Sequence, residues 1–389
     1  MYNIKKLYYT DKKSEMIAIG KAFAEGYDSA WLQEIKDALN CVKDWEEFSG
    51  GTWTAEEVFY KAIYDYWAYG FAPGEQSQYQ LLNKSHEEKS TYLSMNGKFA
   101  YLSRLNKKAD MHILEDKFEA YQLLKPYYKR DVIKIENEND YAAFLVFIEK
   151  HPEFVAKPIG LYCAIGVRKV KVSDYADAKT LFLALINSVN EYEVTTNRWT
   201  KHHAVVLEEL IEQDETYAAI HPQSVNGVRI TTIRIGNDIH ICYPWLKVGV
   251  INNIVASAGQ GGFDAGIDAT TGILDSDGFI EDGTALKYHP VTKVKIKGFQ
   301  IPKWDEAISL AKEVAMSLPR TINYVGWDFV LTPKGWIVME GNFYGDPMWQ
   351  MYYEKGMKAD FEELIQWKPE NKFWWQQNNR FIEKTAGLE

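Results

Sequence analysis

The chain has 389 residues and a formal net charge of -10 at pH 7. This length exceeds what one hydrophobic core usually serves, so we expect two or three packed units. The acidic balance argues against a nucleic-acid binder that works through a general basic surface. The three cysteines lie far apart without metal-ligand spacing, which indicates a reducing, cytoplasmic setting. The longest strongly apolar run, residues 142–148, is far too short for a transmembrane segment.

Residues 1–105 carry apolar side chains at three- and four-residue spacing, which predicts a helical region. We expect helices over residues 15–23, 30–48, 54–69 and most of 77–105. Thr54 and Glu57 have the spacing of a capping box at the start of the third helix. Many tyrosines lie in this region. Core packing is the simpler interpretation of them, and an aromatic platform for a sugar or another acceptor is the alternative.

Residues 106–205 alternate short strands with helices. We expect helices over residues 117–128, 140–150 and 177–190, and strands over 131–135, 154–157, 167–172 and 204–207. Lys157 ends one of these strands, and a loop bounded by Gly160 and Gly166 follows it. The backbone N–H groups of such a loop and one ammonium can meet a polyphosphate. The alternative is a plain hairpin with a surface lysine.

Residues 205–345 are expected to be mostly strands and loops. A strand over 205–211 runs into acidic residues, which can offer backbone groups to a base and a carboxylate to a ribose. The strand over 226–234 places Arg229 and Arg234 on opposite faces. The Gly-rich stretch 251–268 is expected to be a long functional loop, with a β connection as the alternative. Residues 304–318 are expected to form a helix.

Residues 324–342 have the pattern of a β-hairpin with a turn at Thr-Pro-Lys-Gly. If the loop is 333–335, Asp328 lies opposite Glu340, and Asn342 shares their face. Two opposed carboxylates repel each other and destabilise a hairpin, whereas a divalent cation between them reverses that effect. We therefore predict a Mg²⁺ site at Asp328, Glu340 and Asn342. The alternative is a solvated polar face on an edge hairpin.

The order of these signals resembles the ATP-grasp family over about residues 110–345. The likeness rests on Asp116-Lys117, Val155-Ala-Lys157-Pro158 with its glycines, Leu207-Glu208-Glu209-Leu210-Ile211, Asp328, and Glu340-Gly341-Asn342. Within that family the chain is most similar to the sugar-transfer-associated branch, which is distantly related to α-L-glutamate ligases. This narrower likeness rests on the segment 224–229, on Asn253 and on the stretch 257–262.

The resemblance implies an α+β fold in which two subdomains grip ATP, preceded by a helical N-terminal region. The implied boundaries are 1–105 for that region, 106–205 for the subdomain with the phosphate loop, and 206–389 for the subdomain with the metal site. The implied roles are as follows: phosphate binding by Lys117, Lys157 and the loop Gly160–Gly166; adenine binding by the backbone of Glu208, Glu209, Leu210 and Ile211; ribose binding by Glu215; metal binding by Asp328, Glu340 and Asn342.

The sequence departs from the family pattern at two places. Relatives often carry an arginine two residues before the first metal-binding aspartate, and here that position is Gly326. Arg229 or Arg234 is expected to replace that arginine from a neighbouring strand, and both stay open as the catalytic cation beside Lys157. The phosphate loop also carries the bulky residues Leu161 and Tyr162, which puts the closeness of its backbone to phosphate in question.

The function implied is an ATP-dependent carboxylate–amine ligase that forms an amide through an acyl phosphate, on a substrate that could be linked to a sugar or polysaccharide. ATP and Mg²⁺ are the expected cofactors, with Mn²⁺ as a substitute, and small carboxylates and amines are the expected substrates. The acceptor pocket is expected to be formed by Asn226, Arg229, Asn253, Gly261 and Gly262. Association with polysaccharide-biosynthesis enzymes is a further expectation. The alternatives are a kinase that phosphorylates a hydroxyl of a sugar or another acceptor, and a non-catalytic carbohydrate-binding protein.

Overall fold

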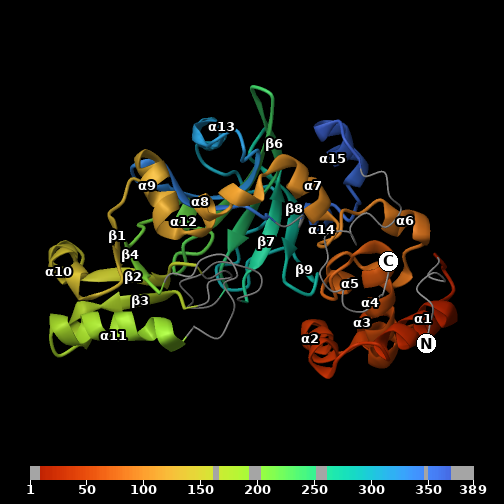
Figure 1. The fold of residues 1–389 in the computed structure, drawn as a ribbon. Coiled ribbons are helices and arrows are strands. Elements are labelled where there is room, and N and C mark those ends of the chain that lie inside the picture. Colours follow the sequence, from red (N-terminus) through yellow and green to blue (C-terminus); the bar gives the residue numbers. More distant parts are fainter. Residues whose placement is uncertain (1–8, 161–165, 192–202, 251–260, 346–348, 369–389) are drawn as a thin grey trace. The chain divides into compact units, whose positions relative to one another are not determined.

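The structure is a computed structural model that describes residues 9–160, 166–191, 203–250, 261–345 and 349–368 (Figure 1). The chain forms two compact units. The first comprises Met1–Leu105, Phe279–Ala285 and Asp346–Glu389, and the second comprises Asn106–Gly278 and Leu286–Gly345. The first unit is mainly helical, and the second contains a four-stranded sheet and most of a seven-stranded sheet. The expected α+β class with a helical N-terminal region is confirmed.

The first unit is built around the packing of α1 against α4. Ile63, Tyr64 and Trp67 of α4 are almost fully buried in its core. The predicted capping box is present, because Thr54 Oγ1 accepts from Glu57 N and Glu57 Oε2 accepts from Thr54 N. The helices of this unit are α1 Lys13–Ala24, α2 Ser29–Leu39, α3 Trp45–Phe48, α4 Ala55–Tyr69, α5 Glu75–Gln78, η2 Leu81–Asn83, α6 His86–Ser90, α7 Lys98–Leu105, α14 Trp349–Tyr352 and α15 Lys358–Ile365.

Two helical expectations for this unit are wrong in extent. The helix expected over 30–48 is two helices, α2 and α3, because Asp44 starts a new helix. Its Oδ1 accepts from the backbone N–H groups of Glu46 and Glu47, as an N-cap does. The region expected to be mostly helical over 77–105 consists of short helices, and a second capping box, between Ser85 and Glu88, starts one of them.

The first sheet of the second unit is antiparallel, with strand order β1-β4-β2-β3. Helices α10 and α11 cover one face of it through Phe144, Phe147, Phe182 and Leu185. The elements of this part are η3 Lys108–Asp110, α8 His112–Glu115, α9 Lys117–Tyr128, β1 Val132–Ile135, η4 Glu138–Asp140, α10 Tyr141–Lys150, β2 Glu153–Pro158, β3 Arg168–Lys171, η5 Val172–Asp174, α11 Ala178–Glu191 and β4 Val205–Glu209.

The second sheet has strand order β11-β10-β5-β6-β7-β8-β9, and helix α13 packs against β5, β6, β10 and β11. Its elements are α12 Glu215–Ala218, β5 Gly227–Ile235, β6 Asp238–Val248, β7 Phe263–Ile267, β8 Leu274–Phe279, β9 Ala285–Leu286, α13 Trp304–Ser317, β10 Tyr324–Thr332 and β11 Gly335–Asn342. The expectation of a loop over 251–268 is wrong for its last part, because β7 pairs there with β6.

The hairpin β10–β11 has a tighter turn than expected. Thr332 pairs with Gly335, so the turn is Pro333–Lys334 rather than a three-residue loop. Thr332 Oγ1 accepts from Lys334 N at 3.2 Å and donates to Gly335 O at 2.8 Å, and Gly335 has φ +97°, a conformation that favours glycine. A register shift between Asp328 and Phe329 then brings Asp328 opposite Glu340. The predicted pairing is therefore present, but a β-bulge produces it.

Candidate active site

The predicted metal ligands converge on one face of the hairpin β10–β11. Asp328 pairs with Glu340, and Gly326 pairs with Asn342. Asn342 Nδ2 lies 3.4 Å from both Asp328 Oδ2 and Glu340 Oε1. Asp328 is 1% exposed, whereas Glu340 and Asn342 are half-buried. A buried carboxylate, a second carboxylate and an amide oxygen on one face form a donor set that suits a hard divalent cation.

Two cations, from strands β5 and β6, contact the buried carboxylate. Arg229 on β5 donates from Nε to Asp328 Oδ1 at 2.5 Å and from Nη2 to Oδ2 at 2.9 Å. Lys247 on β6 places its Nζ 3.3 Å from each of these oxygens. Burial alone would raise the pKa of Asp328, but Arg229 and Lys247 more than offset it and hold that pKa well below its usual range. The site therefore collects positive charge around a carboxylate that stays ionised.

The structure distinguishes Arg229 from Arg234, the two arginines that the sequence offered as the catalytic cation. Arg229 crosses the space above Gly326, where an added Cβ would lie 3.2 Å from its Nη1. Arg234 points to the other side of β5, and its guanidinium donates to the carbonyls of Ala315 and Leu318 at the end of α13. Arg229 is therefore the arginine that lies with the predicted metal ligands, and Arg234 binds the C-terminal end of a helix.

The two predicted phosphate lysines lie near the end of β2, a central strand of the first sheet. Lys157 at the end of β2 forms an ion pair with Glu208 Oε1 at 2.5 Å. Lys117 begins α9, and its Nζ donates to Ile159 O at 3.3 Å. Burial lowers the pKa of Lys117 to about 8, Glu340 opposes this shift, and Lys157 adds to it. Because both Lys157 and Glu340 affect the pKa of Lys117, Lys117 lies between the predicted phosphate lysine and a predicted metal ligand.

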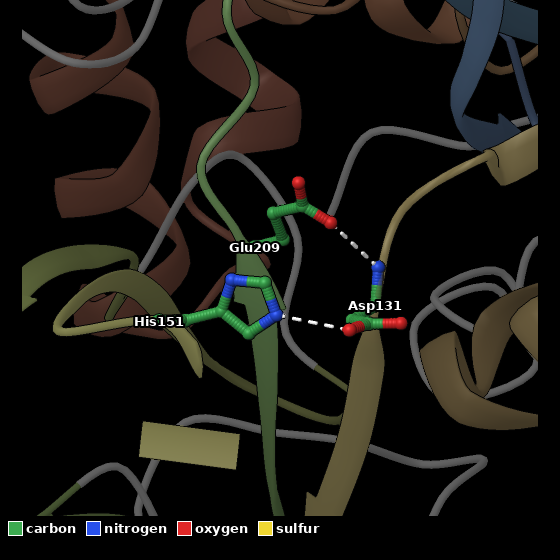
Figure 2. Close-up of side chains that lie close together, drawn as sticks. All are labelled: Asp131, His151 and Glu209. Carbon is green, nitrogen blue, oxygen red and sulfur yellow. Dashed lines mark hydrogen bonds and ion pairs between the residues drawn. The ribbon is translucent and has the colours of Figure 1, made fainter. Parts of the chain in front are cut away.

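Glu208 is held by its side chain as well as by its position in β4. Arg130 donates from Nε and Nη2 to Glu208 Oε2 at 3.1 and 2.8 Å, while Lys157 contacts Oε1. Burial alone would raise the pKa of Glu208, but Arg130 and Lys157 lower it to about 2. The neighbouring Glu209 accepts from Asp131 N at 2.9 Å, as Figure 2 shows.

The remaining predicted site residues occupy the links between strands. Gly160 is buried just after β2, and Gly166 has φ +75°; the residues between them lie outside the described chain. Leu210 and Ile211 join β4 to α12, where Glu215 is exposed. This link is tied to the second sheet, because Asp214 N donates to Leu331 O at 2.9 Å.

The predicted acceptor residues that the structure describes do not lie together on one face as the predicted metal ligands do. Asn226 is fully buried, and its amide donates to Gln213 Oε1, Tyr217 O and His221 O, so it fixes the segment before β5. Asn253 lies outside the described residues. Gly261, with φ +81°, and Gly262 stand just before β7. Within the described residues, Arg229 is the predicted acceptor residue that contacts a predicted metal ligand.

Sequence reasoning missed Lys247 and Arg130. Lys247 ends a mostly apolar strand just before a Gly-rich stretch, which is the same signal that singled out Lys157, so it could have been found. Arg130 lies between a helix and a strand, and its role depends on contacts with β4 and β11, which no local pattern indicates.

Comparison with known protein families gives a match over most of the chain. The sequence model of the sugar-transfer associated ATP-grasp family matches residues 96–365. The chain belongs to that family. No curated protein sequence matches it significantly.

Solved structures with a similar fold are ATP-grasp ligases of low sequence identity. The D-alanine-D-alanine ligase from Helicobacter pylori is 17% identical, with a TM-score of 0.41, over 71% of this chain and 69% of that one. The ATP-grasp ligase PsnB in complex with a minimal precursor is 13% identical, with a TM-score of 0.39, over 67% and 62%. The L-amino acid ligase from Bacillus licheniformis is 13% identical, with a TM-score of 0.39, over 67% and 50%. The match thus spans less than two thirds of the PsnB and L-amino acid ligase chains.

Each helix in the described part of this ATP-grasp chain is too short or too polar to cross a lipid bilayer.

Proposed function

We propose that this ATP-grasp protein is an ATP-dependent carboxylate–amine ligase. The observation that carries the proposal is the convergence of Asp328, Glu340 and Asn342 on one face, with Arg229 and Lys247 on the same carboxylate. Phosphoryl transfer requires mainly alignment and charge neutralisation, because charge accumulates on the phosphate oxygens. Arg229 and Lys247 supply positive charge, the carboxylates can hold a divalent cation, and Lys117 and Lys157 extend the cluster toward the phosphates.

The residues divide the chemistry as follows. Lys117 and Lys157 bind phosphate oxygens of ATP, and the link from Glu208 to Ile211, with Glu215, receives the nucleoside. Arg229 and Lys247 hold the substrate carboxylate and the transferring phosphoryl group close to each other. Mg²⁺, held by Asp328, Glu340 and Asn342, would neutralise phosphate charge, and Mn²⁺ has similar ligand preferences.

The reaction runs in two balanced steps. A carboxylate oxygen of the substrate bonds to the γ-phosphorus while the bond to the β-phosphate oxygen breaks, which gives ADP and an acyl phosphate. The nitrogen of an amine then bonds to the acyl carbon, the carbon–oxygen bond to phosphate breaks, and the amine loses a proton. The products are an amide, ADP and phosphate. Water must be kept from the acyl phosphate, and we assign that task to the acceptor pocket around Asn226, Arg229, Asn253, Gly261 and Gly262.

A screen of amino acids and uronic acids with Mg-ATP tests the proposal. We expect phosphate release that depends on both a carboxylate and an amine, together with a new amide detected by mass spectrometry. A kinase would instead leave the phosphate on a hydroxyl of the acceptor, so the mass of the product separates the two activities. A protein that shows no thermal stabilisation by Mg-ATP would be neither enzyme and would fit a non-catalytic carbohydrate-binding role.

The description of the family supports a sugar- or polysaccharide-linked substrate, and we include this as the finer part of the proposal. Uronic acids test it directly, because they carry a carboxylate on a sugar ring. Association with polysaccharide-biosynthesis enzymes follows from the same description and can be tested by co-purification of the full chain from cells.

A further inference from the structure

Arg130 occupies the junction between α9 and β1 and is 8% exposed. Its guanidinium has acceptors on both sheets of the second unit. On the first sheet, Nε and Nη2 donate to Glu208 Oε2 at 3.1 and 2.8 Å. On the second, Nη1 donates to Val338 O at 2.7 Å and Nη2 to Met339 O at 3.1 Å. One buried side chain thus connects strand β4 to strand β11.

The two carbonyls that Arg130 binds lie at the β-bulge of the hairpin. Phe329 pairs with Val338 and Asp328 pairs with Glu340, so Met339 is the extra residue. A bulge bends its strand and redirects the side chains that follow it. Here the residue that follows is Glu340, a proposed metal ligand. By binding Val338 O and Met339 O, Arg130 fixes the backbone that aims the carboxylate of Glu340.

The other partner of Arg130 leads to the nucleotide side of the site. Glu208 offers one oxygen to Arg130 and the other to Lys157, whose Nζ lies 2.5 Å away. A chain of contacts therefore runs from Lys157 through Glu208 and Arg130 to the bulge beside Glu340. Its members come from β2, β4, the α9–β1 junction and β11, so it spans both sheets of the unit.

The backbone beside Arg130 is firmly attached to the first sheet. Asp131 N donates to Glu209 Oε2 at 2.9 Å, and Asp131 Oδ2 is paired with His151 Nε2 at 3.0 Å. Figure 2 shows both contacts. Glu209 N in turn donates to Asp131 O at 2.9 Å. These bonds account for the close approach of the three side chains, which we interpret as an anchor for the junction. Lys129 adds a contact on the other side, from Nζ to Trp336 O at 3.3 Å.

We propose that Arg130 is a positioning residue that sets the spacing between the phosphate-binding Lys157 and the metal ligand Glu340, so that a nucleotide and its metal ion bind together. This inference rests on the proposed function. The planar fork of arginine reaches well-separated acceptors from three nitrogens in fixed directions, whereas the ammonium of lysine donates from a single nitrogen. A small misplacement of groups that act together can cost about 100-fold in rate. The spacing between Lys157 and Glu340 therefore matters, although Arg130 itself is not proposed to contact the nucleotide or the metal ion.

The test measures how strongly Mg²⁺ and ADP assist each other's binding. Calorimetry gives the Kd of ADP for the full chain with Mg²⁺ and with a chelator, and the ratio of the two Kd values is the coupling. Couplings of this kind are typically about 5- to 150-fold. We expect the ratio to fall at least about fivefold in Arg130→Met and at least about threefold in Arg130→Lys, which keeps the charge but not the fork. The Lys variant also covers the case in which the Met variant does not fold.

His151→Gln is the matched control, because it perturbs the same junction without reaching β11. We expect its coupling ratio to equal that of the wild type even if its unfolding temperature falls. A ratio within twofold of the wild type in a folded Arg130 variant overturns the inference, as does an equal loss in His151→Gln. If the wild-type chain binds ADP neither with nor without Mg²⁺, the proposed function fails, which is a different result from a coupled wild type with unchanged variants.

Discussion

At the residue scale, the site depends on charges that are buried in pairs rather than singly. Asp328 is 1% exposed and is contacted by Arg229 and Lys247. Removing one partner from such a group is costly, because a charge is left without compensation away from water. The less buried Glu340 is therefore the better position for a functional test, since its charge can be removed with less damage to the fold.

We expect Glu340→Gln to lower ATP-dependent phosphate release by about 10²- to 10³-fold, because it weakens the binding of Mg²⁺, whose positive charge stabilises the transition state. The side chain keeps its size, so the unfolding temperature should change little. Glu306→Gln is the control, since Glu306 is an exposed glutamate on α13 in the same unit. Steady-state phosphate release with a verified acceptor checks this, and near-wild-type turnover in Glu340→Gln would remove the metal assignment.

A second residue-scale prediction concerns a buried triad in the helical unit. Lys61 and Lys89 share the carboxylate of Asp65, and all three side chains are fully buried. Burial lowers the pKa of Lys61 to about 7, although Asp65 opposes the shift. Between about pH 7 and about pH 10.5 the unfolded chain therefore holds a proton on Lys61 that the folded chain has lost. The contribution of Lys61 to stability must rise with pH across this window.

Urea denaturation at pH 7 and pH 9 tests this expectation. The free energy of unfolding of the wild type, taken relative to Lys61→Met, should be larger at pH 9 than at pH 7. Lys36→Met, which removes an exposed lysine from α2, should show no such pH-dependent difference. A difference between wild type and Lys61→Met that is flat with pH would show that Lys61 stays protonated inside the fold.

At the element scale, the sequence predicted which strands carry the proposed site. It did not predict the β-bulge that sets which side chains of β11 face Asp328. The strand pattern and the turn at Pro333 were enough to predict the hairpin. A uniform register, however, places Val338, Glu340 and Asn342 on one face of β11. The bulge at Met339 instead leaves Val338 paired with Phe329 and turns Glu340 and Asn342 to the face of Asp328. A bulge depends on contacts such as those of Arg130, which a local pattern does not contain.

Helix packing gives a prediction at the same scale. At Gly20 on α1, an added Cβ would lie 2.0 Å from Tyr60 O on α4. The two helices can therefore approach this closely only because residue 20 has no side chain. We expect Gly20→Ala to cost about 1–3 kcal/mol of unfolding free energy, because α1 must move away from α4. Gly26→Ala, whose Cβ would have an ordinary 3.5 Å contact with Phe23 O, should change stability by less than about 0.5 kcal/mol. Equal effects of the two variants in urea denaturation would contradict this explanation.

At the scale of the whole molecule, the proposed nucleotide groups are not spread evenly over the chain. Lys117, Lys157, Glu208, Asp328 and Glu340 all belong to the second compact unit. The sequence could predict that concentration, because the motifs occur in order along residues 110–345. It could not predict that residues 349–368 group with the N-terminal helices, since that depends on contacts such as Tyr101 OH to Glu362 Oε1 at 2.6 Å.

This division predicts where a nucleotide stabilises the protein. A ligand at 100 times its Kd stabilises the state that binds it by about 2.7 kcal/mol, and only segments whose opening breaks the site gain the full effect. We expect Mg-ATP to slow hydrogen exchange most in β2, β4, α9 and the hairpin β10–β11, and least in the core of α1 and α4. Mass spectrometry of peptides from the intact chain measures this, and Glu340→Gln should weaken the protection in the hairpin. Protection centred on α1–α4 would place the nucleotide in the helical unit and contradict the site described for the second.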